Sequence, residues 1–129
     1  MRIPKIVAVV PLLLSWGCAT TPPSPRVGLD TTMGVGATAV MLEDALPLGR
    51  PVYVGDEDLF EKGLLGQSQR IGDVDVVTID PRLDELTRVM VLIHEYAHFL
   101  VWESGGDSGH GDDWGREYVR VFRVWIGAE

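Results

Sequence analysis

Cysteine is nearly absent from this chain, because Cys18 is the only one among 129 residues. A single cysteine excludes an intramolecular disulfide and a zinc site built on several thiolates. Long apolar runs are also missing: the run from Ile6 to Leu14 covers about 9 residues, whereas a membrane-spanning helix needs roughly 20. Basic residues are few, with 11 Lys and Arg against 19 Asp and Glu and a formal net charge of -8. That balance argues against nucleic acid and anionic lipid as main partners.

The first 17 residues are typical of an export signal rather than of a membrane anchor. Arg2 and Lys5 give a positive start, the short apolar run follows, and small residues lead up to Cys18. The segment Leu-Ser-Trp-Gly-Cys resembles a bacterial lipoprotein cleavage box, although Ser15 stands where that box prefers an aliphatic residue. We predict a signal peptide over residues 1–17, a lipid on Cys18 and a location in the cell envelope. A signal without lipidation, cleaved or uncleaved, is the alternative.

After this signal the composition indicates a tether and one domain. Residues 18–26 are rich in proline and polar side chains, and residues 27–129 are enough for a single compact domain. Residues 38–46 fit either a short helix or a strand, residues 51–54 fit a strand, and Asp56 is a candidate cap for a helical turn that Gly63 closes.

The second half of the domain has clearer periodicity. The β-branched residues at 74–79 predict a strand, and Asp80-Pro81 then predict the start of a helix that runs to about residue 102. Its apolar face recurs at helical spacing. A final helix is predicted over 112–126, with an aromatic stripe facing the core and an arginine stripe, Arg116, Arg120 and Arg123, facing solvent.

The segment His94-Glu95-Tyr96-Ala97-His98 lies inside the first of these helices. Side chains four positions apart project from neighbouring points on one helix face, so two imidazoles placed in this way can bind one zinc ion. Glu95 is turned by about 100° from His94, which suits a base that acts on water. We therefore predict His94 and His98 as zinc ligands and Glu95 as the catalytic base. A solvated histidine pair is the alternative, but the neighbours are mostly apolar, and burying unpaired polar groups is costly.

A third ligand is expected because a catalytic zinc uses three protein ligands and keeps one position open. His110 is the remaining histidine, and the Gly-rich segment 104–109 can return the chain to the helix. We predict His110 as the third ligand, with Glu117, Glu103 and Asp107 as alternatives.

The order His-Glu-x-x-His, short loop, His-Gly-x-x-Trp and aromatic helix resembles the SprT-like group of small zinc metallopeptidases, above all its compact phage and bacterial members. The resemblance covers about residues 74–126 and is carried by His94, Glu95, His98, His110, Gly111 and Trp114. It implies a compact zincin-like α+β core, with a small β-sheet, the His-Glu-x-x-His helix and a C-terminal helix, three histidine ligands and a glutamate base. Two departures, the export signal and the lack of a cysteine-rich zinc module, argue against a role on DNA.

These observations predict a zinc-dependent hydrolase with one Zn²⁺ per chain, acting as a peptidase on a peptide or protein substrate. Tyr118 or an arginine of the last helix is a candidate stabiliser of the oxyanion, and Asp107, Asp112 and Asp113 are candidate partners of the imidazole N–H groups. A lipid on Cys18 would add a membrane contact, and no nucleic acid is expected. The alternatives are a zinc-dependent hydrolase of peptidoglycan amide bonds, a non-catalytic zinc-binding envelope lipoprotein and a metal-free envelope protein.

Overall fold

The computed structural model describes residues 34–107 and 109–128, together with the backbone of residues 16–18. The predicted signal peptide and tether lie outside these residues, apart from the strand that ends at Cys18. Within the described ranges, none of the helices combines the length and the apolar character needed to cross a membrane. The elements in chain order are β1 (Trp16–Cys18), α2 (Val35–Ala45), β2 (Val52–Asp56), the 3-10 turn η2 (Phe60–Lys62), β3 (Gly66–Ile71), β4 (Val74–Ile79), α3 (Glu85–Ser104) and α4 (Asp112–Trp125).

The four strands form one mixed sheet in the order β1-β3-β4-β2. β3 and β4 are an antiparallel hairpin whose turn contains Gly72, at a positive φ of 59°. β2 pairs with β4 in parallel, and β1 pairs antiparallel with β3 so that Trp16 lies opposite Ser68. The described sheet therefore ends at β1 on one side and at β2 on the other.

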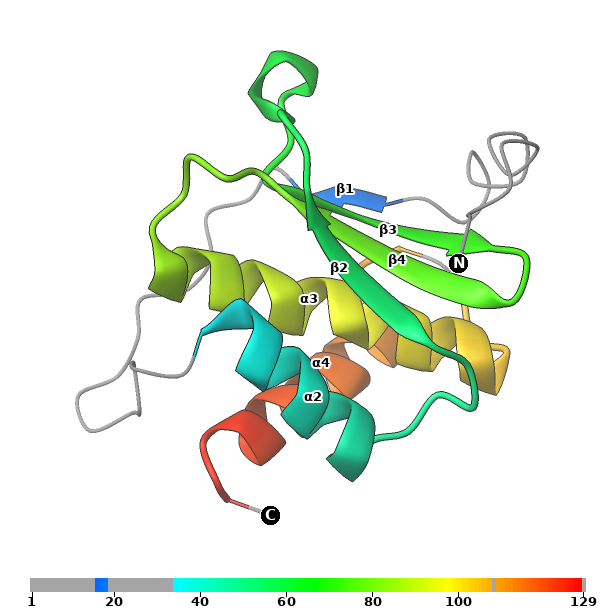
Figure 1. Cartoon of the computed structure of the whole chain (residues 1–129). Coiled ribbons are helices and arrows are strands. Elements are labelled where there is room, and N and C mark those ends of the chain that lie inside the picture. The colour runs from blue at the N-terminus through cyan, green and yellow to red at the C-terminus, as the bar shows by residue number, and fades with distance from the viewer. Residues whose placement is uncertain (1–15, 19–33, 108, 129) are drawn as a thin grey trace.

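The helices cover one face of this sheet in two layers. α3 runs beneath the strands, and α2 and α4 lie on the far side of α3 (Figure 1). α3 is consequently the centre of the core: from Val89 to Val101 every side chain is buried except His94, which is half-buried. The predicted α+β class is confirmed.

α3 begins later than predicted. Asp84 caps it, with its carboxylate accepting a hydrogen bond from the backbone N–H of Thr87 over 2.9 Å, and the helix starts at Glu85. Asp80 does not cap the helix, because its buried carboxylate instead accepts hydrogen bonds from the backbone N–H groups of Leu59 and Phe60. The helix ends at Gly105, in the left-handed conformation at a φ of 76°.

The hairpin is the main element that sequence patterning missed. β4 occupies the predicted residues 74–79, but β3, with the sequence Gly-Gln-Ser-Gln-Arg-Ile, was not predicted because it has almost no apolar alternation. β3 forms because β4 pairs with it over its whole length, from Gly66 to Ile71, while β1 pairs only with Gly66–Ser68. The inner face of β3 is polar because Ser68 contacts Glu95 and Arg70 pairs with Asp75.

The first half of the domain is only partly as predicted. Residues 35–45 form the helix α2, which resolves the choice between helix and strand. Tyr96 ties α3 to this helix by donating a hydrogen bond to the backbone oxygen of Leu46 over 2.6 Å. Asp56 belongs to the end of β2 and caps no helix, so the predicted helical turn shrinks to η2, which Gly63 closes.

α4 occupies almost the predicted span, residues 112–125. Its aromatic stripe packs on the core, and the predicted arginine stripe is confirmed as exposed, with Arg116 and Arg120 paired to acidic neighbours on their own helix. α4 thus lies against α3 with its aromatic face, and this contact forms one wall of the histidine site.

Candidate metal centre

The three histidines of the chain meet at one point between α3 and the start of α4. His94 and His98 project from the same face of α3, and His110 immediately precedes α4. The Nε2 atom of His110 lies 2.9 Å from Nε2 of His94 and 3.2 Å from Nε2 of His98. Taken together, the candidate ligand atoms lie within 4.8 Å of one another, which is close enough to bind one metal ion.

The loop before α4 places His110. Gly105 turns the chain out of α3, and Gly109 adopts a positive φ of 110°, a conformation that other residues rarely reach. The Asp113 carboxylate accepts a hydrogen bond from the backbone N–H of Asp107 over 3.0 Å, which ties the loop to the first turn of α4. The predicted return of the chain through this Gly-rich segment is therefore what brings His110 to the helix pair.

Aromatic rings flank the cluster. The Trp114 ring lies 4.6 Å from His94, 4.9 Å from His110 and 5.8 Å from His98, measured between ring centroids. Its indole N–H donates to the backbone oxygen of His94 over 3.3 Å. Trp102 stacks on His98 at 6.2 Å between ring centroids. Sequence reasoning missed this contact, although Trp102 lies four positions after His98, the helical spacing that signals such a contact.

Burial keeps these imidazoles neutral at pH 7. It lowers the pKa of His94 to about 4 and the pKa of His98 to about 3, and repulsion from the neighbouring imidazolium charges adds to both shifts. Burial also lowers the pKa of His110. A neutral imidazole nitrogen is the form that binds a metal, so the site does not have to lose protons before a metal enters at neutral pH.

Glu95 lies beside the cluster, on the side of α3 that faces the sheet. Its side chain is fully buried, and its Oε1 atom accepts a hydrogen bond from the Ser68 hydroxyl over 2.7 Å. Helix geometry places Glu95 about 100° from His94 and about 60° from His98 around the axis of α3. The carboxylate thus borders the histidine pair without belonging to the group of three candidate ligands.

The alternative third ligands have other partners. Glu117 pairs with Arg120 at 3.3 Å, and Glu103 pairs with Arg70 at 3.1 Å. Among the described residues, the cluster close enough to hold a metal consists of the three histidines alone. Tyr118 lies next to it, with its ring 6.1 Å from that of His94, and burial raises the pKa of its hydroxyl.

The predicted aspartate partners are only partly placed. The Asp113 carboxylate accepts hydrogen bonds from the backbone N–H of Asp107 and from Arg116, so its contacts stabilise the start of α4. A contact of Asp107 or Asp112 with an imidazole N–H stays a prediction.

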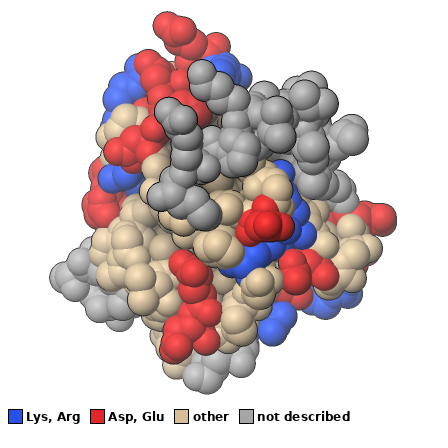
Figure 2. All heavy atoms as spheres, turned by 45° about the vertical axis from the view of Figure 1, so that its right-hand side comes forward, with Lys and Arg blue, Asp and Glu red and all other residues tan. Residues whose placement is uncertain are grey.

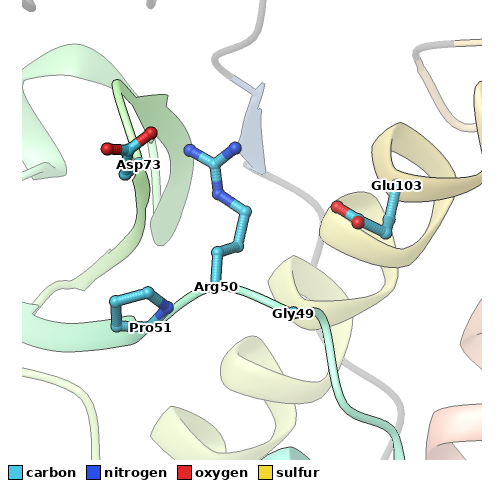
Figure 3. Close-up of a pocket in the computed structure, with 5 residues that line it drawn as sticks. All are labelled: Gly49, Arg50, Pro51, Asp73 and Glu103. Carbon is cyan, nitrogen blue, oxygen red and sulfur yellow. The ribbon is translucent and has the colours of Figure 1, made fainter.

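A second polar region lies at the far end of α3. Asp75, fully buried on β4, pairs with Arg50 at 3.0 Å and with Arg70 at 2.9 Å. A hollow of about 340 Å³ opens beside it, where Arg50 extends between Asp73 and Glu103 (Figure 3). Acidic and basic side chains also alternate over the face shown in Figure 2. Arg70 also pairs with Glu103, so an ion-pair network centred on Asp75 joins the hairpin to α3.

Comparison of the chain with protein-family models, with curated proteins and with solved structures found no match. The geometry of the site therefore carries the functional argument. It shows three imidazoles able to bind one metal ion, with a buried carboxylate and a wall of aromatic rings beside them.

Proposed function

We propose that this protein is a zinc-dependent peptidase of the SprT-like group, with His94, His98 and His110 as zinc ligands and Glu95 as the catalytic base. The observation that carries the proposal is the meeting of all three histidines within 4.8 Å, next to a glutamate on the same helix. The described cluster contains no carboxylate and no thiolate ligand, which leaves Glu95 for chemistry instead of coordination.

The donor set fits zinc. Neutral imidazole nitrogen atoms suit Zn²⁺ and other late transition ions, whereas Ca²⁺ and Mg²⁺ prefer oxygen ligands. Three protein ligands are the number that leaves a position for water in catalytic zinc sites. When bound, zinc lowers the pKa of a coordinated water toward 7 and polarises a substrate carbonyl.

The protein's own residues would complete the reaction. Glu95 accepts a proton from the attacking water and returns it to the leaving amine as the peptide C–N bond breaks. Tyr118 stands at the edge of the aromatic wall, where its hydroxyl is a candidate donor to the developing oxyanion. Trp114 keeps water away from one side of the imidazoles and fixes the backbone of His94 through its indole N–H.

The proposed place of action is the cell envelope, reached by the signal peptide and a lipid on Cys18. This part of the proposal rests on the N-terminal sequence. Peptide substrates in that compartment include both proteins and the peptide stems of the cell wall. Protein substrates are favoured here because the resemblance to the SprT-like group concerns peptidases.

Hydrolysis of casein by the zinc-loaded protein tests the proposal, with Glu95→Gln as the matched control. The variant removes the base but preserves the size of the side chain, so zinc content should stay at one per chain while turnover disappears. Full activity of Glu95→Gln would show that Glu95 is not the base. Release of amines from purified peptidoglycan but not from casein would favour the cell-wall amide hydrolase, and zinc without either activity would favour a metal-binding lipoprotein.

A further inference from the structure

The Glu95 carboxylate is held by a side chain from the sheet. Ser68 lies in the middle of β3 with its hydroxyl directed at α3, 2.7 Å from Oε1 and 3.0 Å from the backbone oxygen of Glu95. Both side chains are fully buried. The sheet therefore contacts the helix turn that carries the histidines through a hydrogen bond to a buried carboxylate beside them.

Close approach of the strand to the helix makes this contact possible. At Gly66, two residues before Ser68 on the same face of β3, an added Cβ would overlap Val91 and lie 3.5 Å from Cγ of Glu95. A large side chain therefore has no room on this stretch of the strand. A serine and a glutamate in a core are costly to bury unless they bond to each other, since an apolar pair of similar size would pack at no such cost.

We propose that Ser68 is a positioning residue that fixes the Glu95 carboxylate toward the metal centre. A glutamate side chain has three rotatable bonds, and a bond at Oε1 restrains the last of them and so sets the direction of the whole carboxylate. Because Glu95 lies about 60° from His98 around α3, a restraint on its carboxylate fixes that group on the part of the helix surface next to His98. This inference rests on the proposed function.

Acetohydroxamate binding gives a test that does not depend on turnover. This small chelator binds zinc and gives up its hydroxyl proton to a neighbouring carboxylate, so its affinity reports where that carboxylate lies. In the zinc-loaded full-length protein, Ser68→Ala should weaken acetohydroxamate binding roughly tenfold to a hundredfold, the range for losing a hydrogen bond to a charged group. Zinc content should be unchanged, because Ser68 is not a ligand.

A double-mutant cycle separates positioning from a purely structural role. Glu95→Gln should weaken acetohydroxamate binding by itself, and adding Ser68→Ala to it should change the affinity no further. Thr78→Val is the matched control, because Thr78 is a buried hydroxyl on the adjacent strand whose oxygen has no hydrogen-bond partner in the described structure. That variant should bind like the wild type. If Ser68→Ala fails to fold, Ser68→Cys retains the size of the side chain but donates weakly, and it should show the same loss.

Several results would overturn the positioning role. One is that Ser68→Ala binds acetohydroxamate as tightly as the wild type. Another is that Ser68→Ala weakens this binding equally whether residue 95 is Glu or Gln. The third is that the wild type binds no zinc or no acetohydroxamate. Where casein is hydrolysed, Ser68→Ala should lower kcat with little change in KM. If the double-mutant cycle gives the expected affinities but casein is not hydrolysed, the positioning role of Ser68 is supported and the peptidase activity is refuted. The two ideas can therefore fail separately.

Discussion

Acidification from pH 7 to pH 5 should weaken zinc binding far less here than at an ordinary three-histidine site. Protons and zinc compete for the same imidazole nitrogen atoms, so affinity falls as each ligand becomes protonated. Burial holds the pKa of His94 at about 4 and that of His98 at about 3, so both remain almost fully neutral at pH 5. His110 is more exposed, and the same cause lowers its pKa.

The loss of zinc affinity on acidification should differ enough between this site and an ordinary three-histidine site to be measured. Three imidazoles with an ordinary pKa of about 6.5 would each lose about 25-fold in zinc affinity between these pH values, or about 15,000-fold together. Here His94 and His98 contribute almost nothing to the loss. His110 contributes less than an ordinary histidine, so the total should be at most about 30-fold.

Competition with a chromophoric chelator whose own affinity is calibrated at each pH would measure this loss. Folding at pH 5 is checked in parallel by circular dichroism. A decrease above about a thousandfold in a folded protein would refute the reasoning, because His94 and His98 would then titrate as exposed histidines do.

The remaining predictions concern the scaffold. Asp75→Asn should lower the free energy of unfolding by about 3 kcal/mol, because it leaves Arg50 and Arg70 partly buried without their shared carboxylate. Urea unfolding measures this loss. The control is Asp73→Asn, on the exposed turn of the same hairpin, which should lower the free energy of unfolding little. An equal loss in both variants would contradict the assignment of the buried network. A chain that begins at Ala19 lacks β1 but keeps α3, α4 and the loop between them, and elemental analysis should still find one zinc per chain. Loss of zinc on that truncation would mean that β1 is needed to hold the site together.

The site was easier to predict from the sequence than the sheet. His94 and His98 lie on a strongly periodic helix, so their common face follows from helix geometry alone. His110 was predicted because the glycines before it allow the chain to reverse. Its observed distances to the helix pair agree with that reasoning.

β3 could not be predicted in the same way. Its inner residues Gly66, Ser68 and Arg70 are small or polar because they face Val91, Glu95 and the Asp75 network, and these contacts lie far away in the sequence. Apolar alternation, the local signal for a strand, is therefore absent. The start of α3 was predicted too early for a related reason. Asp80 has the local sequence of a helix cap, but its carboxylate accepts hydrogen bonds from the backbone N–H groups of Leu59 and Phe60, which lie far away in the sequence.

Zinc content tests the central claim most directly. The wild-type protein, purified without chelator, should carry one zinc per chain by elemental analysis, and His110→Ala should lose it or bind it much more weakly, with Glu117→Gln as the control that keeps it. Retention of zinc by His110→Ala and its loss in Glu117→Gln would move the third ligand to that carboxylate. A folded wild-type protein that takes up no zinc even after reconstitution would contradict the account.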